Sequence, residues 1–175
     1  RMRCFDCFRQ PHLCMPCASL AHQLSPFHRL LEWEMQAGFW KKLTRADLRI
    51  RLHYGHNGQP CPRRRSAFRE VLVVHDRGMT KIPVALCSCR DSRAPLKKGK
   101  KRPLPGNGSW PGSWDMPRTV YTVDVLRQYH LLTLQAHTTV HDFHAYLRRT
   151  TDNVALHLVP VCSPELRLKA SLTGT

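Results

Sequence analysis

Four cysteines near the start of the chain form two pairs with the spacing of metal ligands. The stretch "RCFDCFRQPHLCMPC" holds Cys4, Cys7, Cys14 and Cys17 as two Cys-x2-Cys pairs. Such a turn lets two thiolates reach one zinc ion, which takes four thiolate or imidazole ligands in a closed structural site. The first residues contain no apolar signal segment, so we expect a reducing compartment, where cysteines at short spacings indicate metal ligands rather than disulfides. These residues therefore predict a zinc cluster.

Two histidines, His22 and His28, follow the cysteine pairs in "ASLAHQLSPFH" and extend the ligand set. Two arrangements are open. In one, which is similar to part of a B-box-like cross-braced module, Cys4 and Cys7 share an ion with both histidines, and Cys14 and Cys17 need a further pair from upstream. In the other, the four cysteines hold one ion and the histidines are surface residues.

A second ligand set lies downstream. "YGHNGQPCP" offers His56 and Cys61, and "ALCSC" offers Cys87 and Cys89, which is the number of ligands that one closed zinc site needs. The alternative is a group of buried, inert thiols. In total we predict one or two structural Zn²⁺ ions.

Short strands are expected to position the second set. Apolar and polar residues alternate over 48–54, which predicts a half-buried strand. The stretch "EVLVVHDRGMTKIPVALC" predicts a hairpin that turns near 76–78, and Pro83 favours an edge position for its second strand.

Two helices are predicted in the last third of the chain, and we expect them to form an antiparallel pair. "TVDVLRQYHLLTLQ" and "TTVHDFHAYLRR" each carry an apolar stripe at helical spacing, and Thr139 with Asp142 has the spacing of a capping box. His137, His141 and His144 lie close in sequence, but an exposed polar helix face explains them better than a metal site.

Positive charge dominates the composition. The chain has 28 Lys and Arg against 12 Asp and Glu, a net charge of +16, which is typical of a protein that binds a polyanion such as DNA. The segment "KKGKKRP" also resembles a nuclear localisation signal. No apolar run is long enough for a membrane span, so we expect no membrane partner. We also expect no small-molecule substrate. The expected DNA contacts are Arg63, Arg64, Arg65, Lys97, Lys98, Lys100, Lys101 and Arg102.

Several segments together resemble a known family. "RCFDC", "LCMPCASLAHQLSPFHRLLEW", "LRIRLHYGHNGQPCP", "ALCSC" and "PRTVYTVDVLRQYHLLTLQAHTTVHDFHAYLRRTTDN" are similar to the CxC-type (class two) cysteine cluster associated with fungal KDZ (Kyakuja-Dileera-Zisupton) transposases. The resemblance extends over residues 1 to about 153. All ten predicted ligands fall on cysteine or histidine positions of that family: Cys4, Cys7, Cys14, Cys17, His22, His28, His56, Cys61, Cys87 and Cys89.

The resemblance implies an accessory domain that binds zinc, precedes a transposase catalytic core and recognises DNA or protein. Relatives commonly carry a further cysteine pair upstream, which would supply the missing pair of the cross-brace. The stretch 97–116 departs from the family pattern, and the residues after Asn153 lose it, as a truncated gene end would.

We therefore predict an α+β fold: a small zinc-stabilised module with a B-box-like N-terminal cluster, a short antiparallel β region and a C-terminal helical pair. We expect a Cys/His zinc cluster over 1–34 and a β-rich region with the second cluster over 35–90. A basic Pro/Gly/Ser-rich linker over 91–118 should lead to a helical hairpin over 119–152 and a disordered tail over 153–175.

The predicted function is a non-catalytic, nuclear, zinc-binding accessory domain of a KDZ-type DNA transposase that helps to bind transposon or target DNA. We found no acidic triad of the kind that transposition requires. The alternative is a zinc-dependent module for self-association or for docking to the transposase catalytic domain. A hydrolase that uses zinc-bound water is disfavoured, because complete Cys/His sets leave no open coordination position.

Overall fold

A computed structural model describes residues 1–45, 47–54, 58–62, 68–86, 108–112 and 117–160. The chain divides into two compact units, Arg1–Arg51 and Leu52–Thr175. This division lies inside the segment 35–90, which we had treated as one β-rich region, and the predicted domain boundaries stay predictions.

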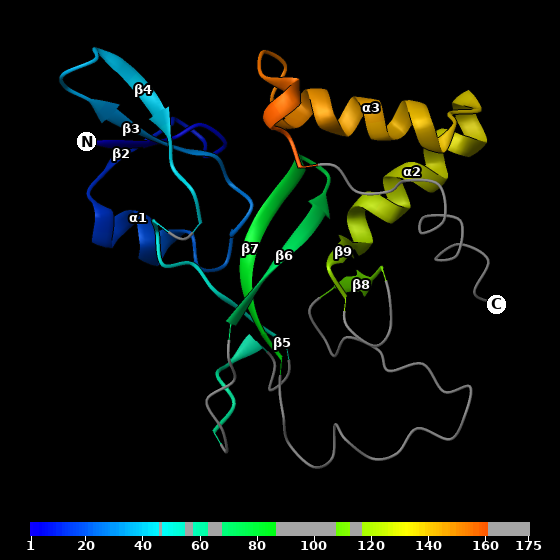
Figure 1. The fold of residues 1–175 in the computed structure, drawn as a ribbon, viewed down its shortest axis with the longest axis horizontal. Helices are drawn as coiled ribbons and strands as arrows, with labels where there is room; N and C mark the ends of the chain where they lie inside the picture. Colours follow the sequence, from blue (N-terminus) through cyan, green and yellow to red (C-terminus); the bar gives the residue numbers. More distant parts are fainter. Residues whose placement is uncertain (46, 55–57, 63–67, 87–107, 113–116, 161–175) are drawn as a thin grey trace. The chain divides into compact units, whose positions relative to one another are not determined.

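The first unit is built on an antiparallel sheet with one short helix (Figure 1). The sheet has the order β2-β1-β3-β4, and its strands are β1 (Met2–Cys4), β2 (His12–Leu13), β3 (Leu30–Glu34) and β4 (Phe39–Lys42). The helix, α1 (Met15–Ala21), lies between β2 and β3 in the sequence. One buried cluster forms its core: Met2, Cys4, Ala18, Leu30, Leu43, Leu48 and Ile50. Such a small core makes additional covalent or metal crosslinks important for stability.

The second unit contains a five-stranded sheet in the order β5-β7-β6-β9-β8. Its strands are β5 (Leu52–Tyr54), β6 (Phe68–His75), β7 (Gly78–Leu86), β8 (Ser109–Pro111) and β9 (Thr119–Thr122). β6 and β7 form the predicted hairpin, in which His75 pairs with Gly78. The α+β class is confirmed, but this sheet is mixed rather than antiparallel, because β5 pairs with β7 and β6 with β9 in parallel.

Two expectations about the strands were wrong. The predicted strand over 48–54 is reduced to β5, because Arg49 has a φ of 54° and interrupts the extended backbone. Pro83 does not place its strand at an edge, since β7 lies between β5 and β6. The pairing of β7 with β5 begins only at Val84, so in the described residues the missing N–H of Pro83 faces no β5 partner.

The two predicted helices pack on the second sheet as α2 (Val123–Ala136) and α3 (Val140–Thr151), followed by a short 3₁₀ turn, η3 (Leu156–Leu158). Their inward residues share one core with β6, β7 and β9: Leu72, Val74, Met79, Tyr121, Val125, Tyr129, Val140, Phe143, Leu147 and Val159. Within the described part of the chain, no helix is long and apolar enough to span a membrane.

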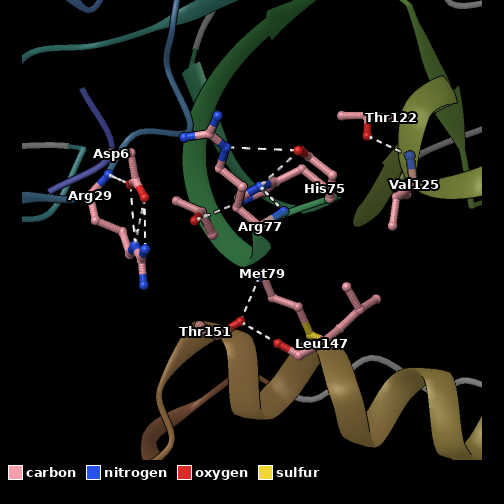
Figure 2. A network of polar contacts seen from close by, with 11 residues as sticks. Asp6, Arg29, His75, Arg77, Met79, Thr122, Val125, Leu147 and Thr151 are labelled. Atoms are coloured by element: carbon pink, nitrogen blue, oxygen red, sulfur yellow. Dashed lines mark hydrogen bonds and ion pairs between the residues drawn. The ribbon is translucent and has the colours of Figure 1, made fainter. Parts of the chain in front are cut away.

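Side-chain hydroxyls fix the helix ends. Thr122 caps α2 by accepting a hydrogen bond from the Val125 N–H, and Thr139 caps α3 by accepting one from Asp142, as the capping-box spacing predicts. At the other end of α3, the Thr151 hydroxyl accepts a hydrogen bond of 2.7 Å from the Met79 N–H (Figure 2). This contact ties α3 to the start of β7.

Two features of this unit differ from the sequence-based expectations. His144 is buried with 8% exposure, rather than on an exposed helix face, and burial lowers its pKa. Residues 153–160, which we expected to be disordered, contain η3 and bury Val159 in the core. The rest of the predicted tail lies outside the described residues.

Candidate metal centre

Four of the predicted ligands lie together in the first unit. Their ligand atoms lie within 4.8 Å of one another, a grouping that could hold a metal ion, and the four residues are Cys4, Cys7, His22 and His28. Cys4 ends β1 and Cys7 follows in the next loop, whereas His22 is the C-cap of α1 and His28 precedes β3. The site thus joins four consecutive parts of the unit.

The distances fit zinc. The Cys7 sulfur lies 3.4 Å from His22 Nε2 and 3.3 Å from His28 Nδ1, and the Cys4 sulfur lies 3.6 Å from His28 Nδ1. A tetrahedral zinc ion with usual bond lengths separates a sulfur and a nitrogen ligand by about 3.6 Å. The donor set of two thiolates and two imidazoles is also one that zinc accepts in closed sites.

A backbone carbonyl orients His22 for ligation. His22 Nδ1 donates a hydrogen bond of 2.8 Å to the Ala18 carbonyl. Because a carbonyl can only accept, Nδ1 carries a proton, and Nε2 is the nitrogen that the neutral imidazole has left for a metal. A hydrogen bond of this kind behind a ligating imidazole is the usual means of fixing its orientation.

An ion pair joins the two segments that carry the ligands. Asp6 directly precedes Cys7, and Arg29 directly follows His28. The Asp6 carboxylate accepts hydrogen bonds from the Arg29 backbone N–H at 2.6 Å and from its guanidinium at 2.7 Å (Figure 2). The contact with Asp6 raises the pKa of Arg29. The pair therefore joins the two ligand-bearing segments directly, in addition to the ligands themselves.

A buried arginine contributes positive charge near the sulfur ligands. Arg45 is 4% exposed, and burial lowers its pKa to about 10, against the opposing effects of Asp6 and Cys4. The guanidinium is still protonated at neutral pH.

The second cysteine pair lies outside this cluster. Cys14 and Cys17 are both exposed and form no disulfide with each other. Cys14 is the N-cap of α1, and hydrogen bonds from Cys17 lower its pKa while the pKa of Cys17 is raised. Among the described residues, the first of the two predicted arrangements is therefore the one that the structure brings together, and the four-cysteine site is not formed.

The second predicted set lies mostly outside the described residues. Cys61 is half-buried, but His56, Cys87 and Cys89 lie outside the described residues, as do all the predicted DNA contacts. These sites stay predictions. Sequence reasoning missed Asp6, Arg29 and Arg45. An acid inside a Cys-x2-Cys turn and a base next to a ligand histidine were the available signals for the first two.

Comparison with known families decides what kind of domain this is. The family model of the CxC2-like cysteine cluster associated with KDZ transposases matches residues 45–155, more than half of the chain. The chain belongs to this family. The CxC2 domain is an accessory cysteine cluster and not a catalytic domain. Neither a curated protein nor a solved structure matches the chain.

The family match covers 45–155, whereas the resemblance extends from residue 1 to about 153. The match therefore begins after the metal centre. The CxC2 match therefore includes the positions of the second ligand set, His56, Cys61, Cys87 and Cys89. For residues 1–44 the resemblance stays a prediction, and the metal centre rests on its own geometry.

Proposed function

We propose that this chain is a zinc-binding, non-catalytic accessory module of a KDZ-type transposase, that it contributes to binding transposon or target DNA, and that it acts in the nucleus of a fungal cell. The observation that carries the proposal is the Cys4-Cys7-His22-His28 cluster, whose sulfur–nitrogen distances suit zinc, in a CxC2 chain of net charge +16. The zinc supplies a crosslink rather than a reaction.

The donor set supports a structural role. Two thiolates and two imidazoles complete a tetrahedral shell, so no position remains for a water or a substrate. Cys4 and His22 are almost fully buried, with exposures of 0% and 1%. Burial of two ligands protects the site from exchange and suits a centre that stabilises the fold.

Electrostatics support the DNA-binding part of the proposal. A chain with 28 basic residues against 12 acidic ones attracts phosphate and releases counterions when it binds. The basic stretches 63–65 and 97–102 are the proposed phosphate contacts. Contacts of this kind position a protein on DNA without reading its sequence.

Native mass spectrometry of the reduced chain tests the zinc sites. We expect two zinc ions, one fewer after Cys61→Ser, one fewer after Cys4→Ser, and no change after Cys17→Ser, which is the matched control outside the cluster. A chain that retains no zinc would refute the first part of the proposal.

A salt titration tests the DNA-binding part. We expect the affinity for duplex DNA to fall steeply as salt increases, and replacement of Arg63, Arg64 and Arg65 by glutamate to abolish binding. Binding that ignores salt and these charge reversals would refute phosphate contact by this chain.

One observation favours the alternative of self-association or docking to a catalytic domain. Leu131 and Leu134 lie one helical turn apart on α2 and are 53% and 60% exposed. Exposed leucines on a helix are a common contact in assemblies. Sizing by light scattering separates the two proposals, because association through α2 should depend on these leucines and not on the arginines.

A further inference from the structure

The outer face of the first sheet carries an unusual group of side chains. Residues paired directly across antiparallel strands point to the same face, and the face alternates along each strand. Pairs Arg3–His12, Arg3–Leu31, Leu31–Lys42 and Trp33–Trp40 therefore share one side of the sheet. The buried residues Met2, Cys4 and Leu30 occupy the other side. We call the outer side the tryptophan face: Arg3, His12, Leu31, Trp33, Trp40 and Lys42.

Two indole rings form the centre of this face. The rings of Trp33 and Trp40 are edge to face, with centroids 5.3 Å apart, and the ring of His12 lies 5.9 Å from Trp40. Trp33 is 38% exposed, and neither indole belongs to the buried core of the unit. Trp40 is half-buried, so the pair presents a partly exposed aromatic surface, and apolar surface of this kind at a sheet face can mark an interaction site.

The charges of the face are positive. Lys42 is exposed beside the tryptophans, and the Arg3 guanidinium is held by the side-chain oxygen of Gln10. The carboxylates of β3, Glu32 and Glu34, alternate to the opposite side of the sheet. On the described strands, the tryptophan face thus combines aromatic rings and cations with no acidic residue.

We propose that the tryptophan face binds single-stranded DNA, with unpaired bases stacked on Trp33 and Trp40 and the backbone phosphates bound by Arg3 and Lys42. This inference rests on the proposed function and specifies which form of DNA the first unit takes. Aromatic platforms with flanking cations are suited to single strands, because every unpaired base offers a face to stack, whereas the bases of a duplex are already stacked on one another. An acidic peptide would use the cations but leave the indoles without a partner.

Matched variants on one strand make the test sharp. Lys41 and Lys42 are both exposed, but Lys41 pairs with Glu32 and lies on the opposite side of the sheet. Lys42→Ala should weaken binding and reduce the salt slope by about 0.7, the value for one phosphate contact on a single strand. Lys41→Ala should leave the slope unchanged. Phe39, 55% exposed on the opposite side, is the aromatic control for Trp33.

The experiment titrates the zinc-loaded full chain with a short oligothymidine and with a duplex of equal length, and follows tryptophan fluorescence and oligonucleotide anisotropy. We expect the single strand to quench the fluorescence and to bind more tightly than the duplex. Trp33→Ala should weaken single-strand binding about 5- to 150-fold, the loss of one stacked base. Trp33→Phe should restore most of that affinity, and Phe39→Ala should change nothing.

Either of two results would overturn the inference. The first is single-strand binding that shows no quenching and is indifferent to both Trp33→Ala and Lys42→Ala. If the duplex still binds with a steep salt dependence, DNA binding by the chain stands and only the tryptophan face is excluded. The second is binding of neither DNA form, which would refute the proposed DNA role as well. If polyglutamate then binds at the tryptophan face, the partner is an acidic protein instead. Circular dichroism checks that each variant is folded. If Trp33→Ala does not fold, the comparison of Lys42→Ala with Lys41→Ala tests the inference instead.

Discussion

Removal of zinc should unfold the first unit and leave the second folded. The ligands span residues 4–28 and connect β1, the loop after it, α1 and the segment before β3. Without the ion, β1 and α1 are held to the rest of the unit by short strand pairing, one small apolar cluster, the hydrogen bond from the Ser19 hydroxyl to the Leu48 carbonyl and the Asp6–Arg29 ion pair. The second unit has a larger helix-covered core that does not include this site.

The size of the effect follows from the length of the unit. A stability of roughly 0.05–0.15 kcal/mol per residue gives about 3–8 kcal/mol for residues 1–51. Structural zinc supplies about 10–16 kcal/mol in small zinc-finger peptides. The metal term therefore exceeds the whole margin of the unit, and the apo unit should be unfolded at room temperature.

Hydrogen exchange with mass spectrometry can follow the two units separately in one chain. After chelation, we expect peptides from β1, β3 and β4 to exchange at the rate of an unfolded chain, whereas peptides from β6 and α3 keep their protection. Cys4→Ala should reproduce this pattern without a chelator, and Cys17→Ala should not. Protection retained in β3 and β4 after complete loss of zinc would refute the reasoning.

Three further predictions concern local contacts. Gly78→Ala should lower the free energy of unfolding by about 2–5 kcal/mol, measured by urea denaturation, because φ is 122° and the new methyl group would collide with the last residue of α3. Thr139→Ala should raise the pKa of Asp142, because the hydrogen bond from the Thr139 hydroxyl lowers that pKa in the native protein. The contact stabilises α3 at pH values above the ordinary carboxyl pKa, and this contribution is lost as the pH falls through the lowered pKa of Asp142. NMR titration of Asp142 would measure the change. Cys14 should be alkylated by iodoacetamide faster than Cys17 at neutral pH, because the backbone N–H and the side chain of Cys17 both lower the pKa of Cys14. Cys17→Ala should slow the alkylation of Cys14 only in part, because it removes the side-chain contact and keeps the backbone N–H.

The sequence was most informative where periodicity and residue type agree. The apolar stripes of α2 and α3, the cap at Thr139 and the hairpin of β6 and β7 were predicted from local patterns alone. The ligand types of the metal centre were predicted in the same way, but not which four residues meet. Cys4-x2-Cys7 and Cys14-x2-Cys17 have identical spacing, and only the long-range pairing of β1 with β3, which brings Cys4 opposite Leu30, separates the two pairs.

Alternation misled the prediction where two cores meet along the sequence. Leu48 and Ile50 are buried in the first unit, whereas Tyr54 is buried in the second, so one regular pattern serves two separate clusters. The left-handed backbone at Arg49 breaks the strand between them. A period-two pattern records which residues are buried, not that they are buried against the same surface.

The metal centre and the tryptophan face depend on the same strand. Cys4 ends β1 on the buried side, and Arg3, its neighbour, points to the outer side. Because a shift of one residue would exchange the two faces, we expect ligation of Cys4 to fix the register that presents Arg3 beside the indoles. On the proposed function, zinc would then control nucleic-acid binding without touching nucleic acid. Chelation should lower single-strand affinity at least as much as Trp33→Ala does, and Cys17→Ala should leave that affinity unchanged; a chelated chain that binds the single strand normally would show that the face does not need the metal.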